Sequence, residues 1–260
     1  MEKLRISLLQ QSIVEDNPEA NLNKLEKKLI TLKGQTDIAI VPELFTTGFA
    51  LKNLNLAEDS FHGNTINKLK QWAFDYGIAL SGSFLVKDKN AYFNRAFFIT
   101  PNSDTFFYDK RHLFRMGRES EVLTEGNNAE LFTYKGWDIR LLICYDLRFP
   151  VWSRNITPYY DLLIYVANWP SVRQKVWKTL LSARAMENQS YVIGVNRIGK
   201  DRNQLDHHGF SCVYSPKGDL LCAAPINKEA ILQVEIELNE VTRLRNKFPV
   251  WKDADKFELL

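Results

Sequence analysis

Three polar residues with complementary chemistry each stand at the end of an apolar segment. Glu43 comes after an apolar run and one proline, Lys110 follows a run rich in aromatic residues, and Cys144 directly follows an aliphatic run. Such runs are typical of buried strands, and ligands of α/β sheets bind at the carboxyl ends of strands. We therefore expect the three side chains to converge on one pocket.

Together these residue types can cleave a carbon–nitrogen bond. A free thiol has a pKa of roughly 8.5 and needs help to act as a nucleophile near neutral pH. An ammonium group would stabilise the thiolate and the oxyanion that forms when sulfur adds to an amide carbonyl. A carboxylate would take the thiol proton and later pass one to the departing amine. The trio thus predicts Cys144 as a nucleophile assisted by Glu43 and Lys110.

Each residue also has a plainer interpretation. A cysteine at the end of a buried strand is most often inert packing, and the charged run that holds Lys110 would be a solvated surface in most proteins. His112 offers the alternative Cys–His route to a thiolate, but the sequence gives it little support. No spacing resembles a metal-chelating motif, so a metal is not expected.

The elements that position these residues alternate between strand and helix patterns, which predicts an α/β fold with helices covering a mixed sheet. One domain over 1–260 is favoured, because the length is near the upper end of what one core can serve and no linker divides it. Residues 110–128 are predicted to form a long functional loop. Strands are expected at 4–9, 37–41, 78–86, 92–100, 105–109, 139–143, 161–166, 191–195, 209–214, 220–223 and 231–236. Helices are expected from Pro18 with Asn17 as cap, along the face of Ile66, Leu69 and Ala73, near 149–150, and after Ser171 as a cap.

The composition excludes several classes of protein. The net charge of +3, from 34 basic and 31 acidic side chains, does not suggest a nucleic-acid binder. No apolar run reaches the ~18 residues that a membrane span needs, and no signal-peptide pattern is apparent. The three cysteines form no C-x-x-C pair, which favours a reducing compartment, here the cytoplasm, over a disulfide scaffold or a zinc site.

Longer segments around these residues resemble a known family. VPELFTTGF (41–49), YDKRHLF (108–114) and LLICYDLRFP (141–150) closely resemble, in order, the three signature motifs of the nitrilase superfamily of carbon–nitrogen hydrolases. The segments ANWP (167–170), RAMENQSYVIGVNRIG (184–199) and SPKGD (215–219) are also similar to family segments. The resemblance spans nearly the whole chain. It is strongest to the bacterial omega-amidases, which hydrolyse the side-chain amide of 2-oxo acid amides such as 2-oxoglutaramate and 2-oxosuccinamate.

This resemblance implies a four-layer α-β-β-α sandwich and a Glu–Lys–Cys triad that uses neither a metal nor an organic cofactor. Glu43 would be the general base, Lys110 the cationic stabiliser and proton partner, and Cys144 the nucleophile that forms a thioester. The backbone N–H of Tyr145 would be a second donor to the oxyanion. The resemblance also implies a homodimer or a higher homo-oligomer, with the unpatterned tail 242–260 covered by a neighbouring subunit.

A further glutamate follows the lysine motif in many members of the family. Glu119 matches its place best and Glu121 is the rival. The choice stays open because this loop lacks the commoner Pro-Gly element and reads Arg-Met-Gly-Arg at 115–118.

The substrate contacts are less clear from the sequence. Asn168 and Trp169 follow a predicted strand and are expected to line the site. Arg148 is a candidate partner for a substrate carboxylate or else a structural anchor, and Arg115 and Arg118 are the other available cations. Arg184 and Glu187 are expected to form a structural pair, and the histidines other than His112 are expected to be surface or hydrogen-bonding residues.

The leading functional hypothesis is an amidase that uses water to hydrolyse a small carboxylate-bearing amide, with an omega-amidase as the most specific form. Within the same enzyme class, the substrate could instead be deaminated glutathione, an N-carbamoyl amide or a nitrile. The hypothesis from another class is a catalytically silent scaffold that keeps the fold for binding.

Overall fold

The computed structural model describes residues 2–49, 51, 53–128, 131–155 and 160–255 of the 260-residue chain. Two six-stranded sheets pack face to face. In spatial order the first sheet holds β14 (Ala230–Glu237), β1 (Lys3–Gln10), β2 (Ile38–Ile40), β3 (Ala79–Asp88), β4 (Ala91–Ile99) and β5 (Thr105–Asp109). The second holds β13 (Leu220–Ala223), β12 (Cys212–Tyr214), β9 (Tyr191–Asn196), β8 (Leu162–Ala167), β7 (Trp137–Ile143) and β6 (Leu131–Tyr134).

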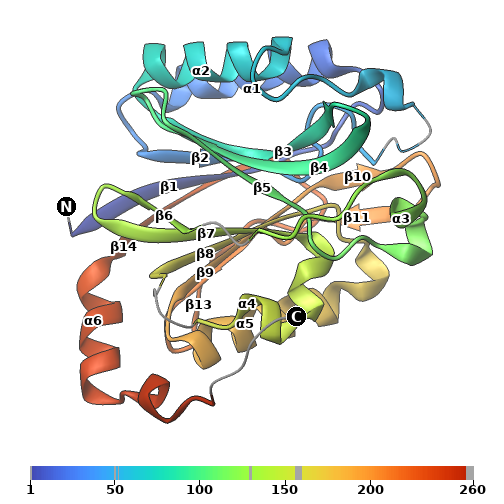
Figure 1. Ribbon diagram of the computed structural model, residues 1–260. Helices are drawn as coiled ribbons and strands as arrows, with labels where there is room; N and C mark the ends of the chain where they lie inside the picture. The colour runs from blue at the N-terminus through green and yellow to red at the C-terminus, as the bar shows by residue number, and fades with distance from the viewer. Residues whose placement is uncertain (1, 50, 52, 129–130, 156–159, 256–260) are drawn as a thin grey trace.

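Helices cover the outer face of each sheet (Figure 1). Helices α1 (Pro18–Leu32) and α2 (Asn64–Tyr76) lie over the first sheet, and α4 (Pro150–Ser153) and α5 (Gln174–Asn188) lie over the second. A short hairpin of β10 (Ile198–Lys200) and β11 (Asp206–His208) stands at one end. The predicted single-domain α-β-β-α sandwich is therefore confirmed.

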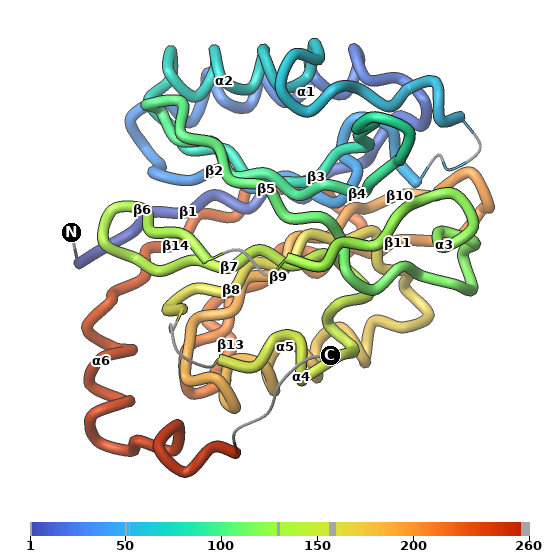
Figure 2. Tube along the Cα trace, viewed as in Figure 1, coloured from blue at the N-terminus to red at the C-terminus, as the bar shows by residue number. Residues whose placement is uncertain are grey.

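The centre of each sheet is parallel and its edges are antiparallel. Strands β1, β2 and β3 run parallel, as do β7, β8 and β9. All residues of β8 and β9 are buried, as expected for parallel strands covered on both faces. Figure 2 shows the chain returning near its end to place β14 beside β1, with which it pairs antiparallel. Three of these central strands, β2, β7 and β8, deliver residues to one end of the sandwich.

Side chains packed between the two sheets and beneath the helices on both sides hold the sandwich together. Aromatic rings fill the space between the sheets; for example, Phe106 stacks on Phe132 with centroids 4.4 Å apart. The outer layer lies under α1, where Leu22, Leu25 and Leu29 are buried. The predicted start of α1 is confirmed: Pro18 is its first residue and the side chain of Asn17 accepts a hydrogen bond from the N–H of Ala20.

Some expected boundaries were wrong. Pro170, with φ of −66°, begins a 3-10 turn, η4 (Ser171–Arg173), so α5 starts later and Ser171 makes no cap hydrogen bond. The region predicted as a loop at 110–128 contains η2 (Arg115–Gly117) and α3 (Glu119–Val122). Strand β6 was not expected. Cys144 itself begins the short 3-10 helix η3 (Cys144–Arg148). Another short 3-10 turn is η1 (Leu54–Leu56).

The C-terminal region is more ordered than its sequence pattern indicates. Helix α6 (Leu238–Lys247) begins before the expected tail, and η5 (Val250–Asp253) follows it. Arg245 anchors α6 to the domain by donating to Oδ1 of Asp161 at 2.8 Å. Phe248 nevertheless remains 63% exposed. Phe257, another aromatic residue of the expected tail, lies outside the described residues. No helix in the described part of the chain is long and apolar enough to cross a membrane.

The buried side chain of Asn21 in α1 ties this helix to the loop after β2. Its Oδ1 accepts from the N–H of Val14 at 2.9 Å, and its Nδ2 donates to the carbonyls of Val14 and Thr46, each at 2.7 Å. We expect Asn21→Ala to lower the free energy of unfolding by ~1–3 kcal/mol, because it leaves buried backbone groups without partners. Urea denaturation measures the change, with Lys27→Ala on the exposed face of α1 as control. A loss no larger than that of the control would contradict this role.

Candidate active site

Strand ends from both sheets bring the three predicted residues together. Glu43 follows β2 and Lys110 follows β5, both in the first sheet, whereas Cys144 follows β7 in the second. The Nζ atom of Lys110 lies 2.8 Å from Oε1 of Glu43. Cys144 lines the same cavity as these two residues, close enough to Glu43 for that carboxylate to raise the pKa of the thiol. The convergence expected from the strand ends is therefore present.

A strained turn presents Cys144. Its φ of 44° lies in the left-handed region, which costs a non-glycine residue about 1–3 kcal/mol. The buried side chain of Asp146 holds this turn, since its Oδ2 accepts from the N–H of Ile143 at 2.9 Å and from the hydroxyl of Tyr108 at 2.8 Å. Its Oδ1 accepts from the N–H of His112 at 3.0 Å. Asp146 thus joins the cysteine turn to β5 and to the segment that follows it.

Several donors orient the carboxylate of Glu43. Besides Lys110, the Nδ2 of Asn94 donates to its Oε1 at 2.8 Å, and the backbone N–H of Asn168 donates to its Oε2 at 2.6 Å. The hydroxyl of Ser83 donates to Oδ1 of Asn94 at 2.9 Å, which fixes the orientation of that amide. Sequence reasoning missed Asn94 and Ser83, because nothing in their spacing distinguishes them from other polar residues in strands.

Of the two glutamates proposed for the loop after the lysine, Glu119 joins the cluster. It is fully buried, and its Oε2 accepts from Nζ of Lys110 at 2.8 Å and from the N–H of Phe114 at 2.7 Å. Glu121 instead pairs with Arg118 at the surface, at 2.7 Å. Lys110 is therefore shared between two buried carboxylates.

The electrostatics of the cluster favour a neutral thiol. Burial alone would lower the pKa of Lys110, but the charges of Glu119 and Glu43 outweigh it and raise that pKa. Burial, reinforced by the charge of Glu43, raises the pKa of the Cys144 thiol well above its ordinary value, although Lys110 opposes the shift. Cys144 thus keeps its proton at rest, next to a carboxylate that can accept it.

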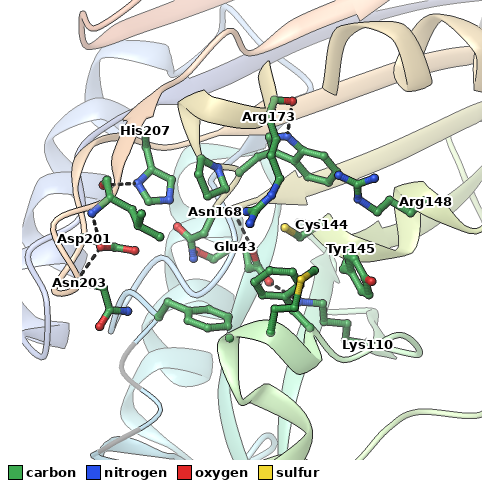
Figure 3. A pocket seen from close by; sticks show the side chains of 17 residues that line it. Glu43, Lys110, Cys144, Tyr145, Arg148, Asn168, Arg173, Asp201, Asn203 and His207 are labelled. Atoms are coloured by element: carbon green, nitrogen blue, oxygen red, sulfur yellow. Dashed lines mark hydrogen bonds and ion pairs between the residues drawn. The ribbon is translucent and has the colours of Figure 1, made fainter. Parts of the chain in front are cut away.

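A cavity of about 190 Å³ lies above these groups. Its size suits a small molecule, since pockets for drug-sized ligands are larger. In Figure 3, Arg148 and Arg173 lie on one side of Cys144 and Lys110 on the other, with His207 toward the opposite end. The lining residues are Glu43, Phe49, Lys110, Phe114, Met116, Gly117, Cys144, Tyr145, Arg148, Asn168, Trp169, Pro170, Arg173, Asp201, Asn203, Leu205 and His207.

Only some of the residues expected at the substrate site line the cavity. Tyr145, Asn168, Trp169 and Arg148 line the cavity as expected. Arg115 and Arg118 do not, because the 3-10 turn η2 points its central residues toward the cavity while Arg115 is exposed and Arg118 engages Glu121.

The cavity also has lining residues that sequence reasoning missed. Arg173 follows ANWP by three residues, which was a usable signal, because that segment ends the strand β8. The β10–β11 hairpin contributes Asp201, Asn203 and His207 to another wall of the cavity. No sequence motif pointed to these three residues. Burial lowers the pKa of His207, so its ring is neutral near pH 7.

Other polar residues near the site support its frame. His112 is partly buried, lies with Nδ1 2.8 Å from Oδ1 of Asp146 and stacks on Phe149, so its role is structural. The expected pair of Arg184 and Glu187 is present at 2.9 Å. Among the described residues, no group of three or more His, Cys, Asp or Glu side chains gathers as metal ligands would.

Comparison with known proteins places these features in a family. A family model described as carbon–nitrogen hydrolase matches residues 5–246. The chain is 40% identical to the omega-amidase YafV of Escherichia coli over the full length of both chains. It is 33% identical to the 2-oxoglutaramate amidase of Bacillus subtilis over 98% of each chain.

Solved structures agree with the fold. The carbon–nitrogen hydrolase superfamily protein XC1258 of Xanthomonas campestris, solved with an arsenic adduct in its active site, superposes over the full length of both chains with a TM-score of 0.96 and 39% identity. An amidase from Nesterenkonia has the same fold at 22% identity, with a TM-score of 0.83 and 95% of each chain covered. These matches argue against a silent binding scaffold. The chain therefore belongs to the carbon–nitrogen hydrolase family and is a cysteine-dependent amidase.

Proposed function

We propose that the protein is an omega-amidase that hydrolyses the terminal amide of a short carboxylate-bearing substrate such as 2-oxoglutaramate or 2-oxosuccinamate. The observation that carries this proposal is the buried pair of Glu43 and Lys110 beside the half-buried Cys144, beneath a small cavity with two arginines in its wall. The names of the relatives from E. coli and B. subtilis support the same substrate class.

In the proposed mechanism, the amide carbonyl of the substrate lies next to Sγ of Cys144. As sulfur adds to the carbonyl carbon, the thiol proton passes to the carboxylate of Glu43. The resulting oxyanion is stabilised by Nζ of Lys110 and by the backbone N–H of Tyr145. Glu43 then gives its proton to the departing nitrogen, the carbon–nitrogen bond breaks, and ammonia leaves behind a thioester on Cys144.

Water completes the reaction by the same route. Glu43 takes a proton from water as its oxygen adds to the thioester carbonyl, and the oxyanion again forms between Lys110 and Tyr145. Collapse of this intermediate breaks the carbon–sulfur bond, releases the carboxylic acid and returns the proton to Cys144. Glu119 shares the charge of Lys110 throughout, so the ammonium stays in place while Glu43 gains and loses its proton.

The size of the cavity helps to discriminate among the possible substrates of this catalytic cluster. The same cluster could act on an N-carbamoyl amide, a nitrile or deaminated glutathione. A volume of about 190 Å³ favours a substrate with a few carbon atoms over deaminated glutathione. We also expect a cytoplasmic location, on the basis of the three free cysteines Cys144, Cys212 and Cys222.

The first prediction on function compares two amides that differ only at the end remote from the amide. We expect kcat/KM for succinamate to exceed that for butyramide by ~10–100-fold, because a charge-assisted contact to a carboxylate contributes ~1.5–3 kcal/mol. Ammonia release measures both rates, and Cys144→Ala should abolish both. Equal values for the two amides would reject the omega-amidase assignment and leave the cysteine-dependent amidase intact.

The second prediction concerns Lys110. We expect Lys110→Arg to lose at least ~1000-fold in kcat, because the rigid guanidinium cannot take the place of a compact ammonium between two buried carboxylates. The exposed substitution Lys87→Arg is the control, and thermal melting checks that both variants fold. A rate for Lys110→Arg within ~10-fold of wild type, or ~1.4 kcal/mol of barrier, would show that Lys110 is not part of the mechanism.

We further propose that the protein is a homodimer or a larger homo-oligomer in which the region after α6 contacts a neighbouring subunit. Exposed apolar side chains there, above all Phe248, are suited to such a contact. We expect Phe248→Ser to weaken self-association by at least ~10-fold, or ~1.4 kcal/mol, in sedimentation equilibrium. Phe74→Ser, at an equally exposed phenylalanine on α2, should not. A wild-type protein that sediments as a monomer at micromolar concentration would refute the proposal.

A further inference from the structure

Arg173 is held in place by the end of strand β8. Its backbone carbonyl accepts a hydrogen bond from Nε1 of Trp169 at 2.8 Å. The N–H of Trp169 in turn donates to Oδ1 of the buried Asn196 at 2.8 Å. The turn that carries Arg173 is thus anchored on both β8 and β9, and its side chain is presented to the cavity (Figure 3).

The guanidinium of Arg173 rests on an aromatic ring from the catalytic region. It lies 5.3 Å from the ring centroid of Phe114. The N–H of Phe114 donates to the buried Glu119, and its ring packs edge-on against Tyr145 at 5.1 Å. The cation is therefore positioned by residues that also position Lys110 and the oxyanion donor.

Arg173 has no acidic partner. In the described part of the chain it forms no ion pair, whereas Arg118, Arg184 and Arg197 each contact a glutamate. A guanidinium remains charged at any ordinary pH, and its planar fork matches a carboxylate through two parallel hydrogen bonds. A half-buried cation that faces a small cavity without a counter-ion is suited to an anionic ligand.

The wall formed by the β10–β11 hairpin carries a negative charge that limits where an anionic ligand can lie. Asp201 lines the same cavity, and its Oδ1 accepts from the N–H groups of Asn203 and Leu205 at 2.8 and 2.9 Å. This fixed negative charge repels a carboxylate. A substrate that carries one therefore places it at the arginine side, with its amide toward Cys144.

We infer that Arg173 is the residue that binds the distal carboxylate of the substrate and so determines the preference for omega-amides. Arg148, which lies over Trp169 at 5.4 Å and is more exposed, contributes less. This inference rests on the proposed function. It assigns carboxylate binding to the turn before α5 instead of the Arg-Met-Gly-Arg stretch considered from the sequence.

The experiment compares the wild type with Arg173→Met, which keeps an unbranched apolar stem and removes the charged guanidinium. The readout is the ratio of kcat/KM for succinamate to that for butyramide. We expect this ratio to fall by ~10–100-fold, Arg173→Lys to restore part of it, and Arg148→Met to lower it less. The matched control is Arg243→Met, at an exposed arginine on α6, which should leave the ratio unchanged.

A binding measurement separates recognition from catalysis. In a Cys144→Ala background, calorimetry should show that Arg173→Met weakens the binding of succinamate by the same factor as the ratio. If Arg173→Met lowers both kcat/KM values equally, or neither, the inference is wrong and Arg173 serves the frame alone. If the wild type releases ammonia from neither amide, it is the proposed function that fails.

Discussion

The site depends on one buried ammonium group between two buried carboxylates. Nζ of Lys110 is within 2.8 Å of both Glu43 and Glu119, and all three side chains are at most 1% exposed. Removing such charges from water costs several kcal/mol for each ion unless every charge is met by a partner. The neighbourhood meets this demand with Asn94, the backbone of Asn168 and the backbone of Phe114. Much of the local structure therefore serves to keep one lysine charged and in place.

This arrangement explains how a cysteine can react without being ionised at rest. A thiolate between two carboxylates would be a third negative charge around one positive charge, and burial together with Glu43 raises the pKa of Cys144 accordingly. In the proposed mechanism, the proton moves to Glu43 as sulfur attacks. Negative charge passes from Glu43 through sulfur to the substrate oxygen while the total charge of the cluster stays constant. A preorganised site of this kind needs little rearrangement during the reaction.

Local patterns predicted the α/β class and the reactive trio, whereas the two-sheet sandwich was expected only from the resemblance to a known family. The predicted strand segments that end at Pro42, Asp109 and Ile143 are each followed directly by one of the three residues that meet in the site. Asn94 could not be predicted, because it becomes important only when β4 pairs with β3 and its amide comes between Ser83 and Glu43. The orientation of Arg118 depends on η2, and the position of His207 depends on a hairpin distant in sequence from the reactive trio. These contacts join residues that are distant in sequence, so they cannot be read from a local sequence pattern.

The division of the site between the two sheets has a consequence for biogenesis. Glu43 and Lys110 follow strands of the first sheet, whereas Cys144 and Asn168 follow strands of the second. A nascent chain in which only one sheet has formed holds either the base or the nucleophile. In the proposed mechanism, the cysteine of such a chain lacks the carboxylate that accepts its proton, so hydrolysis of amides requires that the sheets have docked. Within the proposed mechanism, activity requires both sheets and the contact between them, so ammonia release reports on the assembled sandwich.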